Sequence, residues 1–412
     1  MPGKPEDREH LLATLRLSHA AGVGPVTFRR LVRVFGSPQA ALAAPRSRLV
    51  EVPDLGPRVA DSILGSKDDG WAQEECERAV AQGVRLLTLG EDAYPRALLN
   101  TYDPPPVLYV KGELEPIDAL AVAVVGTRRC SAYGRAQAEK LAAGLARAGF
   151  TVVSGLAKGI DAVAHAGALA QINGRTVAVL GTGLDNVYPP ENRRLFEQIV
   201  AGRGAALSEL PFNSPPSPEQ FPRRNRIIAG LSLGVVVVEG PESSGALITA
   251  RMAVDMDREV FAVPGPVDSP NARGPHRLIK AGAKLVEDVD DILEELREIA
   301  APLVKLPKPD PRLRLGRSRA SAEESSPLLE AAGLQPAPEE LDARPDAADL
   351  RAVNLNPREA QVYSLLDARD ARGIDALIQA SGLRAHEVLS TLLVLEVRRL
   401  CKQLPGKRFV KA

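Results

Sequence analysis

Short apolar runs alternate with longer segments of mixed polarity between residues 120 and 299. The main runs consist largely of Val, Ala and Leu and end at Gly or another small residue: LAVAVVG, FTVVSG, RTVAVLG, GVVVVEG and EVFAVPG. Continuous apolar runs of this length are typical of strands buried on both faces of a parallel sheet. The segments between them, such as GRAQAEKLAAGLARAG, have helical spacing. The alternation predicts a doubly wound α/β domain.

Shorter runs extend this pattern. VRLLTLG and VLYVKG flank a proline-rich stretch and predict edge strands, and AALSE and KLVED add two shorter strand candidates. We therefore expect residues 86–299 to form an extended Rossmann-like domain with a doubly wound parallel sheet. Ligands of such sheets bind outside the carboxyl ends of the strands. The loops that follow the apolar runs are accordingly the place to look for a site.

The first 85 residues predict short helices separated by turns. Two segments, AAGVGPVTFRRLVRVFG and VPDLGPRVADSIL, place a Gly-Pro pair at the start of a helical stretch. The open backbone N–H groups at such a start can hold a phosphate. The two segments resemble a tandem helix-hairpin-helix (SAM-like) module. A helical packing domain without any nucleic-acid contact explains them equally well.

The pattern is lost over residues 300–352, where Pro, Arg, Ser, Ala and Glu dominate and a flexible linker is expected. Residues 353–412 recover three helical patterns and end in LCKQLPGKRFVKA, which predicts two strands around Pro405-Gly406. Three helices and a β-wing predict a winged-helix-like domain. The helix expected to read a DNA groove, GLRAHEVLSTLLVLEV, is mostly apolar, which favours a protein contact or a weak DNA contact.

Composition sets limits on the class of protein. The chain has 412 residues, 45% hydrophobic and 25% charged, with a formal net charge of zero. Its length predicts two to four domains, and a nucleic-acid contact would need locally gathered cations. The three cysteines, Cys76, Cys130 and Cys401, lack metal-ligand or disulfide spacing, which favours reduced thiols in a cytoplasmic protein. The polar start and the absence of long apolar runs predict no membrane contact, and no cofactor is expected.

The loop after the first apolar run, GTRRCSAYG, offers groups suited to phosphate. Gly126 permits a close backbone approach. Thr127 and Ser131 supply hydroxyls, and Arg128 supplies a forked donor. The loop is not G-x-G-x-x-G, and no ribose-binding acid is evident. It therefore gives only weak support to a dinucleotide site.

The second loop, SGLAKGIDAVAHAGAL, predicts a turn of small residues into a helix. Ser154, Gly155 and Lys158 would hold an anion at the positive helix end. Asp161 suits the N-cap position. His165 is better explained as a core residue than as a catalyst, because no nucleophile accompanies it.

The third loop, GTGLDNVYPPENRRL, carries an aromatic residue and two cations. Tyr188 either stacks on a base or packs the loop, and Arg193 and Arg194 suit phosphates. The fifth loop, EGPESSGALITA, adds Ser244 and Gly245 at another helix start. So many anion sites exceed the needs of one mononucleotide and fit a polynucleotide backbone.

The fourth loop, FPRRNRIIAGLS, is the most suggestive. Arg223, Arg224, Asn225 and Arg226 are expected at a helix start, where three positive side chains are unfavourable unless a polyanion balances them. Ion pairs with Glu209 or Glu239 are the alternative. The DNA hypothesis requires these arginines to line an exposed rim rather than to form internal ion pairs.

In this order, GTRRCSAYG, SGLAKGIDAVAHAGAL, TVAVLGTGLDNVYPPENRRL, FPRRNRIIAGLS, SGALITA and VFAVPG closely resemble the DNA-processing protein A family (DprA, also called Smf). The resemblance implies a single-stranded-DNA-binding protein that is not an enzyme. Members of the family protect incoming single-stranded DNA during natural transformation and competence. They displace or bypass single-strand-binding protein, load the RecA recombinase, and form homodimers through the Rossmann-like domain.

The resemblance also assigns site residues. The family's phosphate-contacting arginine matches Arg128, in a loop shared with Gly126 and Ser131. The family's second small turn matches Ser154-Gly155. Its P-x-R-N-R-I loop matches Arg224, Asn225 and Arg226.

One position departs from the family. Some relatives carry a DNA-binding lysine where this chain has Pro190. That contact is in doubt, and Arg193 or Arg194 would compensate for it.

The segment RGPHRLIKAGAKLVED matches the family's dimerisation region, with His276, Ile279 and Leu285 at interface positions. An apolar patch there suits a symmetric dimer. Burial of Ile279 and Leu285 in the core is the alternative. By analogy with the family, the surface for RecA is expected near Val254.

The main rival is a Rossmann-type nucleotide or nucleoside phosphoribohydrolase. Such enzymes carry P-G-G-x-G-T-x-x-E, whose Glu stabilises an oxocarbenium-like transition state. The comparable stretch, EGPESSGALITARM, continues after Thr249 with Ala250 and Arg251 and has no such Glu. This departure weighs against hydrolysis. A pure adaptor, for which DNA binding is incidental, is the third interpretation.

Overall fold

The computed structural model describes residues 5–66, 70–304 and, with gaps, 357–411. The chain divides into two compact units, Met1–Leu303 and Val304–Ala412. None of the described helices is both long enough and apolar enough to cross a lipid bilayer.

The domain boundaries expected after residues 85, 299 and 352 stay predictions. The linker expected over residues 300–352 is described only in its first residues, which end helix α14 (Val289–Val304); the remainder lies outside the described residues. The boundary expected after residue 85 stays a prediction, because the first unit includes both sides of it.

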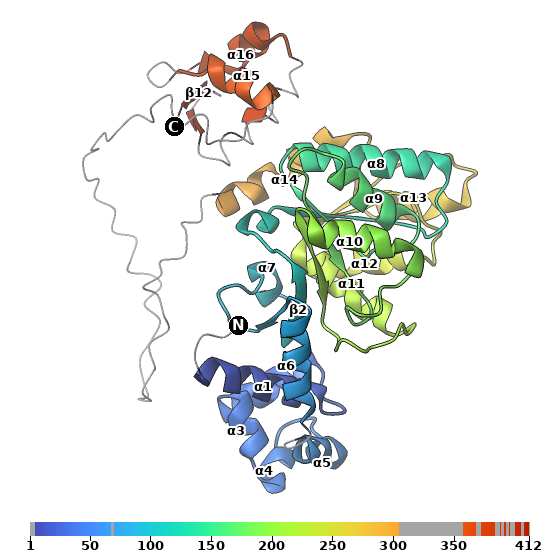
Figure 1. Ribbon diagram of the computed structural model, residues 1–412. Helices are drawn as coiled ribbons and strands as arrows, with labels where there is room; N and C mark the ends of the chain where they lie inside the picture. Colours follow the sequence, from blue (N-terminus) through green and yellow to red (C-terminus); the bar gives the residue numbers. More distant parts are fainter. Residues whose placement is uncertain are drawn as a thin grey trace. The chain divides into compact units, whose positions relative to one another are not determined.

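Nine strands form one sheet within the described part of the first unit (Figure 1). Their order is β1-β2-β6-β5-β4-β3-β7-β8-β9. The strands from β3 onward pair in parallel, whereas β1 and β2 are antiparallel additions beside β6. The order reverses at β3, with β4 on one side and β7 on the other. This arrangement confirms the predicted doubly wound sheet and its edge strands. The strands are β1 (Val84–Thr88), β2 (Val107–Gly112), β3 (Ala121–Val125), β4 (Thr151–Ser154), β5 (Thr176–Val179), β6 (Gly204–Ser208), β7 (Gly234–Val237), β8 (Glu259–Ala262) and β9 (Lys284–Leu285).

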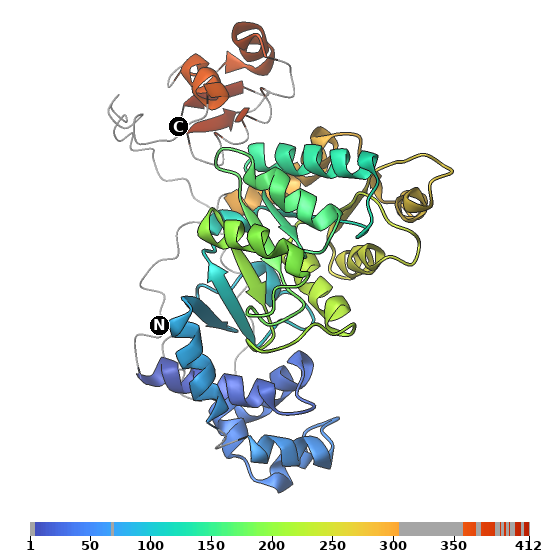
Figure 2. The ribbon, with the colours of Figure 1, turned by 45° about the vertical axis from the view of Figure 1, so that its right-hand side comes forward.

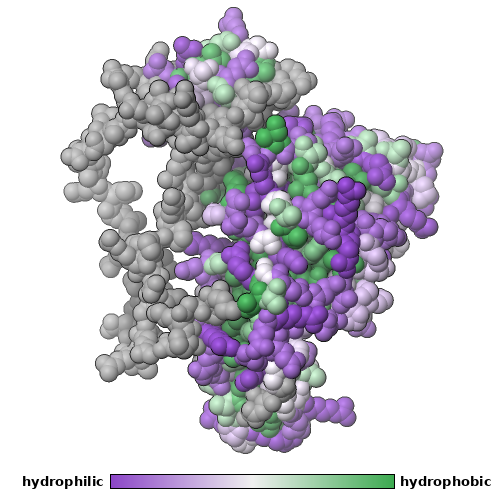
Figure 3. Space-filling model, viewed as in Figure 1, coloured by the Kyte–Doolittle hydropathy of each residue, from purple (hydrophilic) through white to green (hydrophobic). Residues whose placement is uncertain are grey.

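Helices cover both faces of this sheet, which explains why the strand sequences are continuously apolar (Figure 2). Alternate residues of β5 belong to different cores: Val177 and Val179 pack with one helix layer, and Ala178 packs with the other. The outer surface in Figure 3 is mostly hydrophilic, with scattered hydrophobic areas. The helical elements of this part are α7 (Arg96–Leu99), η1 (Pro116–Ala119), α8 (Ala132–Arg147), α9 (Ile160–Leu169), η2 (Pro190–Asn192), α10 (Arg193–Ala201), α11 (Gln220–Leu231), α12 (Gly245–Val254), η3 (Pro270–Ala272) and α13 (Arg273–Lys280).

The N-terminal helices have a core of their own and also join the sheet, because Leu15 of the first helix packs into the sheet's second core. The two Gly-Pro pairs stand at helix starts as expected, with Pro25 and Pro57 in the first turns. Gly22, at φ +84°, lies so close to Val59 that a Cβ would clash, so the two hairpins pack against each other. The helices are α1 (Pro5–His19), α2 (Pro25–Phe35), α3 (Pro38–Ala43), α4 (Arg46–Val50), α5 (Pro57–Gly65) and α6 (Trp71–Ala81).

The second unit has the elements of a winged helix. A three-stranded antiparallel sheet has the order β10-β12-β11. Its core includes Val362, Leu377 and Phe409, together with Leu392 from the third predicted helix. Most of that helix and the Pro405-Gly406 turn lie outside the described residues. The described elements are α15 (Pro357–Leu365), β10 (Arg372–Gly373), α16 (Ile374–Ser381), β11 (Cys401–Leu404) and β12 (Arg408–Lys411).

Candidate nucleic-acid interface

The loops after β3, β4, β5 and β7 meet at one edge of the sheet, as the doubly wound topology predicts. Thr127 donates its backbone N–H to the carbonyl of Glu239 at 2.7 Å, which joins the loops after β3 and β7. The Thr127 carbonyl accepts from the backbone of Ile160 at 3.3 Å, which joins the loops after β3 and β4. We call this edge the rim.

The start of α8 already holds an anion that belongs to the protein itself. The buried carboxylate of Glu239 accepts hydrogen bonds from the Ser131 backbone at 2.9 Å and from the Ser131 hydroxyl at 2.5 Å. A side chain at Gly134 would collide with this carboxylate. The polar groups of Ser131 are therefore used internally, at the position where a Rossmann-like domain would hold a nucleotide phosphate.

The loop after β4 contains a second internal anion. The buried carboxylate of Asp161 accepts from the backbone N–H groups of Gly155 at 3.1 Å and Ala157 at 3.4 Å. Burial raises the pKa of Asp161, while Arg224 opposes the rise. The sequence predicts Asp161 as the N-cap of α9, but the N-cap is Gly159. The hydroxyl of Ser154 is also internal and donates to the Val124 carbonyl at 2.7 Å.

Arg224 ties two strand ends together. It is 6% exposed, and its Nη1 donates to the carbonyls of Gly155 and Val179, each at 2.5 Å. A Cβ at Gly155 would collide with the guanidinium, so glycine is required there. Burial lowers the pKa of Arg224 to about 10; Asp161 opposes this shift and Arg128 adds to it. Arg224 thus stays charged at neutral pH.

Arg226 is held in internal ion pairs. It is 7% exposed and pairs with Glu209 and, at 2.9 Å, with Asp103. Its neighbour Asn225 is also buried and donates to the Gly245 carbonyl at 3.3 Å.

These contacts correct the expectation for the fourth loop. Helix α11 begins at Gln220, so Arg224, Asn225 and Arg226 lie in its second turn rather than at its start. They are buried, and the ion-pair alternative with Glu209 describes Arg226. The exposed rim that the DNA hypothesis required of Arg224 and Arg226 is therefore not found; among the five arginines expected at the site, only Arg128, Arg193 and Arg194 are exposed.

Arg128 lies beside the ring of Phe221, which in turn contacts the ring of Tyr188. Its guanidinium carbon lies 5.2 Å from the ring centroid of Phe221. The Tyr188 ring lies 5.7 Å from the Phe221 ring, with 39° between their planes, and Tyr188 is 39% exposed. We call Arg128, Phe221 and Tyr188 the rim cluster. Phe221 is missing from the sequence-based site, although an aromatic residue directly before P-R-R-N-R was a usable signal.

Further cations of the sequence-based site lie on the surface. Lys158 is exposed and pairs with Glu191, also exposed; such a pair contributes little to stability. A phosphate could therefore take the place of Glu191. Arg193 and Arg194 are exposed in the first turn of α10, directly after Pro190 and the rest of η2.

The remaining small-residue positions have mixed surroundings. Gly126 and Thr127 are half-buried, and the Thr127 hydroxyl accepts from the backbone of Arg129 at 3.2 Å. Ser244 precedes α12, and its hydroxyl is buried without a partner among the described residues. Gly245 is exposed, with open space where a Cβ would lie.

The residues expected at a dimer interface lie in α13 and β9. His276 is half-buried, and its Nε2 is 3.0 Å from the Gly265 carbonyl. Ile279 is half-buried, and Leu285 is exposed on a strand at the sheet edge. Neither side chain is plain core.

His165 is a core residue. It is fully buried, and its Nδ1 lies 2.7 Å from the Thr176 hydroxyl, which itself donates to the Val152 carbonyl. The proton is therefore on Nδ1. Burial, assisted by Arg224, lowers the pKa of His165 to about 3.

A Rossmann-like domain that exposes a guanidinium against an aromatic ring, with a second ring next to it, at its ligand-binding edge is typical of nucleic-acid-binding proteins. The comparison with sequence families agrees: the chain belongs to the family described as DNA recombination-mediator protein A, whose sequence model matches residues 85–297. Models of a DprA-like N-terminal HHH domain and of the DprA winged helix domain match residues 8–47 and 335–407.

Relatives support the same assignment over most of the chain. Protein Smf of Synechocystis is 37% identical over 402 residues, covering 96% of this chain and 97% of that protein. DNA processing protein DprA of Bacillus subtilis is 44% identical over 218 residues, covering 53% and 73%. The X-ray structure of DprA from Streptococcus pneumoniae matches with a TM-score of 0.61 at 35% identity, covering 69% of this chain and 97% of that one. The predicted family and fold are confirmed.

Replacing Arg226 with Met should destabilise the fold. The change leaves the Glu209 carboxylate buried without its partner, which typically costs about 3–5 kcal/mol. Urea unfolding followed by the fluorescence of Trp71, the chain's single tryptophan, measures the effect. Arg223→Met, three residues earlier on the same helix and exposed, is the matched control and should unfold almost as the parent does. Equal midpoints for both variants would show that the ion pairs contribute little.

His165 should make the protein acid-sensitive. In the unfolded state His165 takes up a proton below about pH 6.5, whereas in the folded state it does so only near pH 3. The contribution of neutral His165 to stability is therefore fully present above about pH 6.5 and is lost as the pH falls. His165→Asn keeps an N–H for Thr176 and removes the titration. Between pH 8 and pH 5 the parent should lose about 2 kcal/mol more than this variant. Parallel stability curves for the two proteins would contradict a neutral buried His165.

Proposed function

We propose that the chain binds single-stranded DNA along the rim and acts by binding rather than by catalysis. The observation that carries this proposal is the rim cluster, where the Arg128 guanidinium lies against Phe221 with Tyr188 alongside. Unpaired bases stack on such aromatic faces, and the arginine neutralises a phosphate. Because every base has a π-face, binding should tolerate sequence.

The internal anions favour a chain ligand over a single nucleotide. Glu239 fills the start of α8 and Asp161 occupies the loop before α9, so neither position is open to a nucleotide phosphate. A bound anion would instead meet cations that project outward. Arg128, Lys158 and Arg193 come from the loops after three neighbouring strands. Cations spread over several loops suit the repeating charge of a sugar-phosphate backbone.

Arg224 assists this binding indirectly. The charge of Arg128 lies close enough to Arg224 to lower the pKa of Arg224. Two positive groups near each other raise the local potential and attract a phosphate. Arg224 therefore contributes to the field and holds the strand ends, while Arg128 makes the contact.

In the cell, we propose a cytoplasmic recombination mediator that protects incoming DNA during natural transformation and loads RecA. The family description as a recombination mediator supports this role. Val254, 62% exposed at the end of α12, is the proposed contact for RecA. Displacement of single-strand-binding protein would follow from competition for the same strand. A homodimer through α13 and β9 would gain avidity on a long strand.

Arg128→Ala and Phe221→Leu should weaken DNA binding in different ways. Loss of the Arg128 charge should reduce the slope of log affinity against log salt by about 0.7. Loss of the Phe221 ring should lower affinity about tenfold with an unchanged slope, because stacking is worth about 1–3 kcal/mol per base. Fluorescence anisotropy with oligo(dT) over a salt series measures both.

Arg147→Ala is the control for these variants, since Arg147 is exposed in the last turn of α8, at the other end of that helix. It should bind as the parent does. Parent-like affinity and slope for Arg128→Ala and Phe221→Leu would refute binding at the rim cluster.

Ile279→Glu should convert the dimer to monomers, because a charge would be desolvated at an apolar interface. Light scattering measures the mass. Ile172→Glu, at an exposed isoleucine far along the chain from α13, should leave the dimer intact. A dimer that survives Ile279→Glu would remove α13 from the interface.

A further inference from the structure

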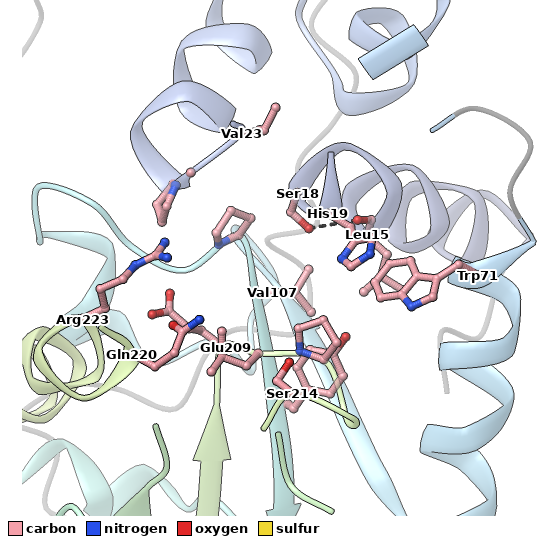
Figure 4. A pocket seen from close by; sticks show the side chains of 16 residues that line it. Leu15, Ser18, His19, Val23, Trp71, Val107, Glu209, Ser214, Gln220 and Arg223 are labelled. Atoms are coloured by element: carbon pink, nitrogen blue, oxygen red, sulfur yellow. Dashed lines mark hydrogen bonds between the residues drawn. The ribbon is translucent and has the colours of Figure 1, made fainter. Parts of the chain in front are cut away.

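A cavity of about 370 Å³ lies between the N-terminal helices and the sheet, outside the rim cluster (Figure 4). Its size is at the lower end of the range for sites that bind small molecules. Gln220, Glu209 and Arg223 lie on one side, and His19 and Trp71 lie on the other. The His19 and Trp71 rings stack at 3.8 Å with 11° between their planes.

One end of the cavity is suited to an anion. Arg223 lines it and is exposed. The start of α2, at Gly24 and Pro25, lines it as well. This eleven-residue helix has no acidic residue in its first turn and no side-chain cap. The first amides of a helix have no partner within the helix, so a helix start at the cavity is suited to a phosphate.

The cavity also contains a polar atom that lacks a partner. The Oε1 of Gln220 is buried and has no hydrogen-bond partner among the described residues. A buried polar atom without a partner destabilises the free protein, so a ligand group that donates to this oxygen would be favoured.

The acceptors of the cavity select for hydrogen-bond donors. Gln220 Oε1 and the Glu209 carboxylate both accept, and both lie near Arg223 in Figure 4. Adenine, cytosine and guanine each carry an exocyclic amino group with two N–H donors, whereas thymine has a single N–H, at N3, between two carbonyl oxygens. An amino group can donate to both acceptors, whereas thymine would place a carbonyl oxygen beside the Glu209 carboxylate, so a base with an amino group is the better match.

We propose that this cavity is a second DNA subsite, which takes one amino-bearing nucleotide with its base toward Gln220 and Glu209 and its phosphate at Arg223 and the start of α2. The proposal rests on the proposed single-strand binding at the rim. The two sites adjoin along the chain: Gln220 lines the cavity and the next residue, Phe221, belongs to the rim cluster. A strand that crosses the first turn of α11 would reach both.

The test compares oligo(dC) with oligo(dT) of equal length on the full-length protein, by fluorescence anisotropy. Gln220→Leu should weaken oligo(dC) binding about 3–10-fold, the value of one hydrogen bond, and leave oligo(dT) binding unchanged. Arg223→Ala should reduce the salt slope for oligo(dC) by about 0.7. Arg33→Ala, an exposed arginine in the last turn of α2, is the matched control and should change neither.

Trp71 supplies a second readout, because the chain's single tryptophan lines the cavity. Oligo(dC) should change its fluorescence and oligo(dT) should not, and urea unfolding by the same signal checks that each variant folds. Parent-like oligo(dC) binding by Gln220→Leu, or equal losses for both strands, would overturn the subsite while leaving the rim in place. Failure of the parent to bind oligo(dT) would instead refute the proposed function.

Discussion

The arrangement of the rim depends on one buried guanidinium. Arg224 donates to carbonyls at the ends of β4 and β5, and it can do so only because Gly155 leaves room for it. Carbonyls at the carboxyl ends of strands would otherwise need water or a ligand as partners. Because Arg224 donates to these carbonyls, they need no ligand or water as a partner at this part of the rim. The loops that follow are thereby held in fixed positions before any ligand arrives.

The buried carboxylates of Glu239 and Asp161 determine what the rim can bind. In a Rossmann-like dinucleotide site the helix start receives the ligand's phosphate; in this protein the Glu239 carboxylate accepts from the backbone N–H and the hydroxyl of Ser131 at the start of α8. Asp161 does the same for the loop after β4. The inner positions of the crevice are therefore filled, and the remaining favourable charges project outward at Arg128 and its neighbours.

The sequence was sufficient for the fold because strands buried on both faces leave an unbroken apolar signature, and the loops that end them share an edge by topology. It was insufficient for the roles of individual arginines. Arg226 pairs with Glu209 and with Asp103, which lies 123 positions earlier in the chain. A local sequence pattern gives no indication of an ion pair between residues so far apart. The repulsion argument for the R-R-N-R run therefore predicted exposed cations at Arg224 and Arg226, which the protein buries; of the arginines in the run, only Arg223 is exposed. Phe221 was not predicted as a site residue, because its role depends on contacts with Arg128 and Tyr188, which lie on other loops.

Helix α11 connects the structural and the binding roles. Its second turn is anchored by Arg224 and Arg226, whereas its first turn carries Phe221 toward the rim cluster and Gln220 and Arg223 toward the cavity. Anchoring the second turn restricts the first, so the cost of ordering these side chains is met during folding rather than on binding. Under the proposed function, a substitution at Arg224 or Arg226 would weaken DNA binding by loosening α11, since both side chains are buried. Loss of binding in such a variant is evidence for a contact only when the fold is shown to be intact.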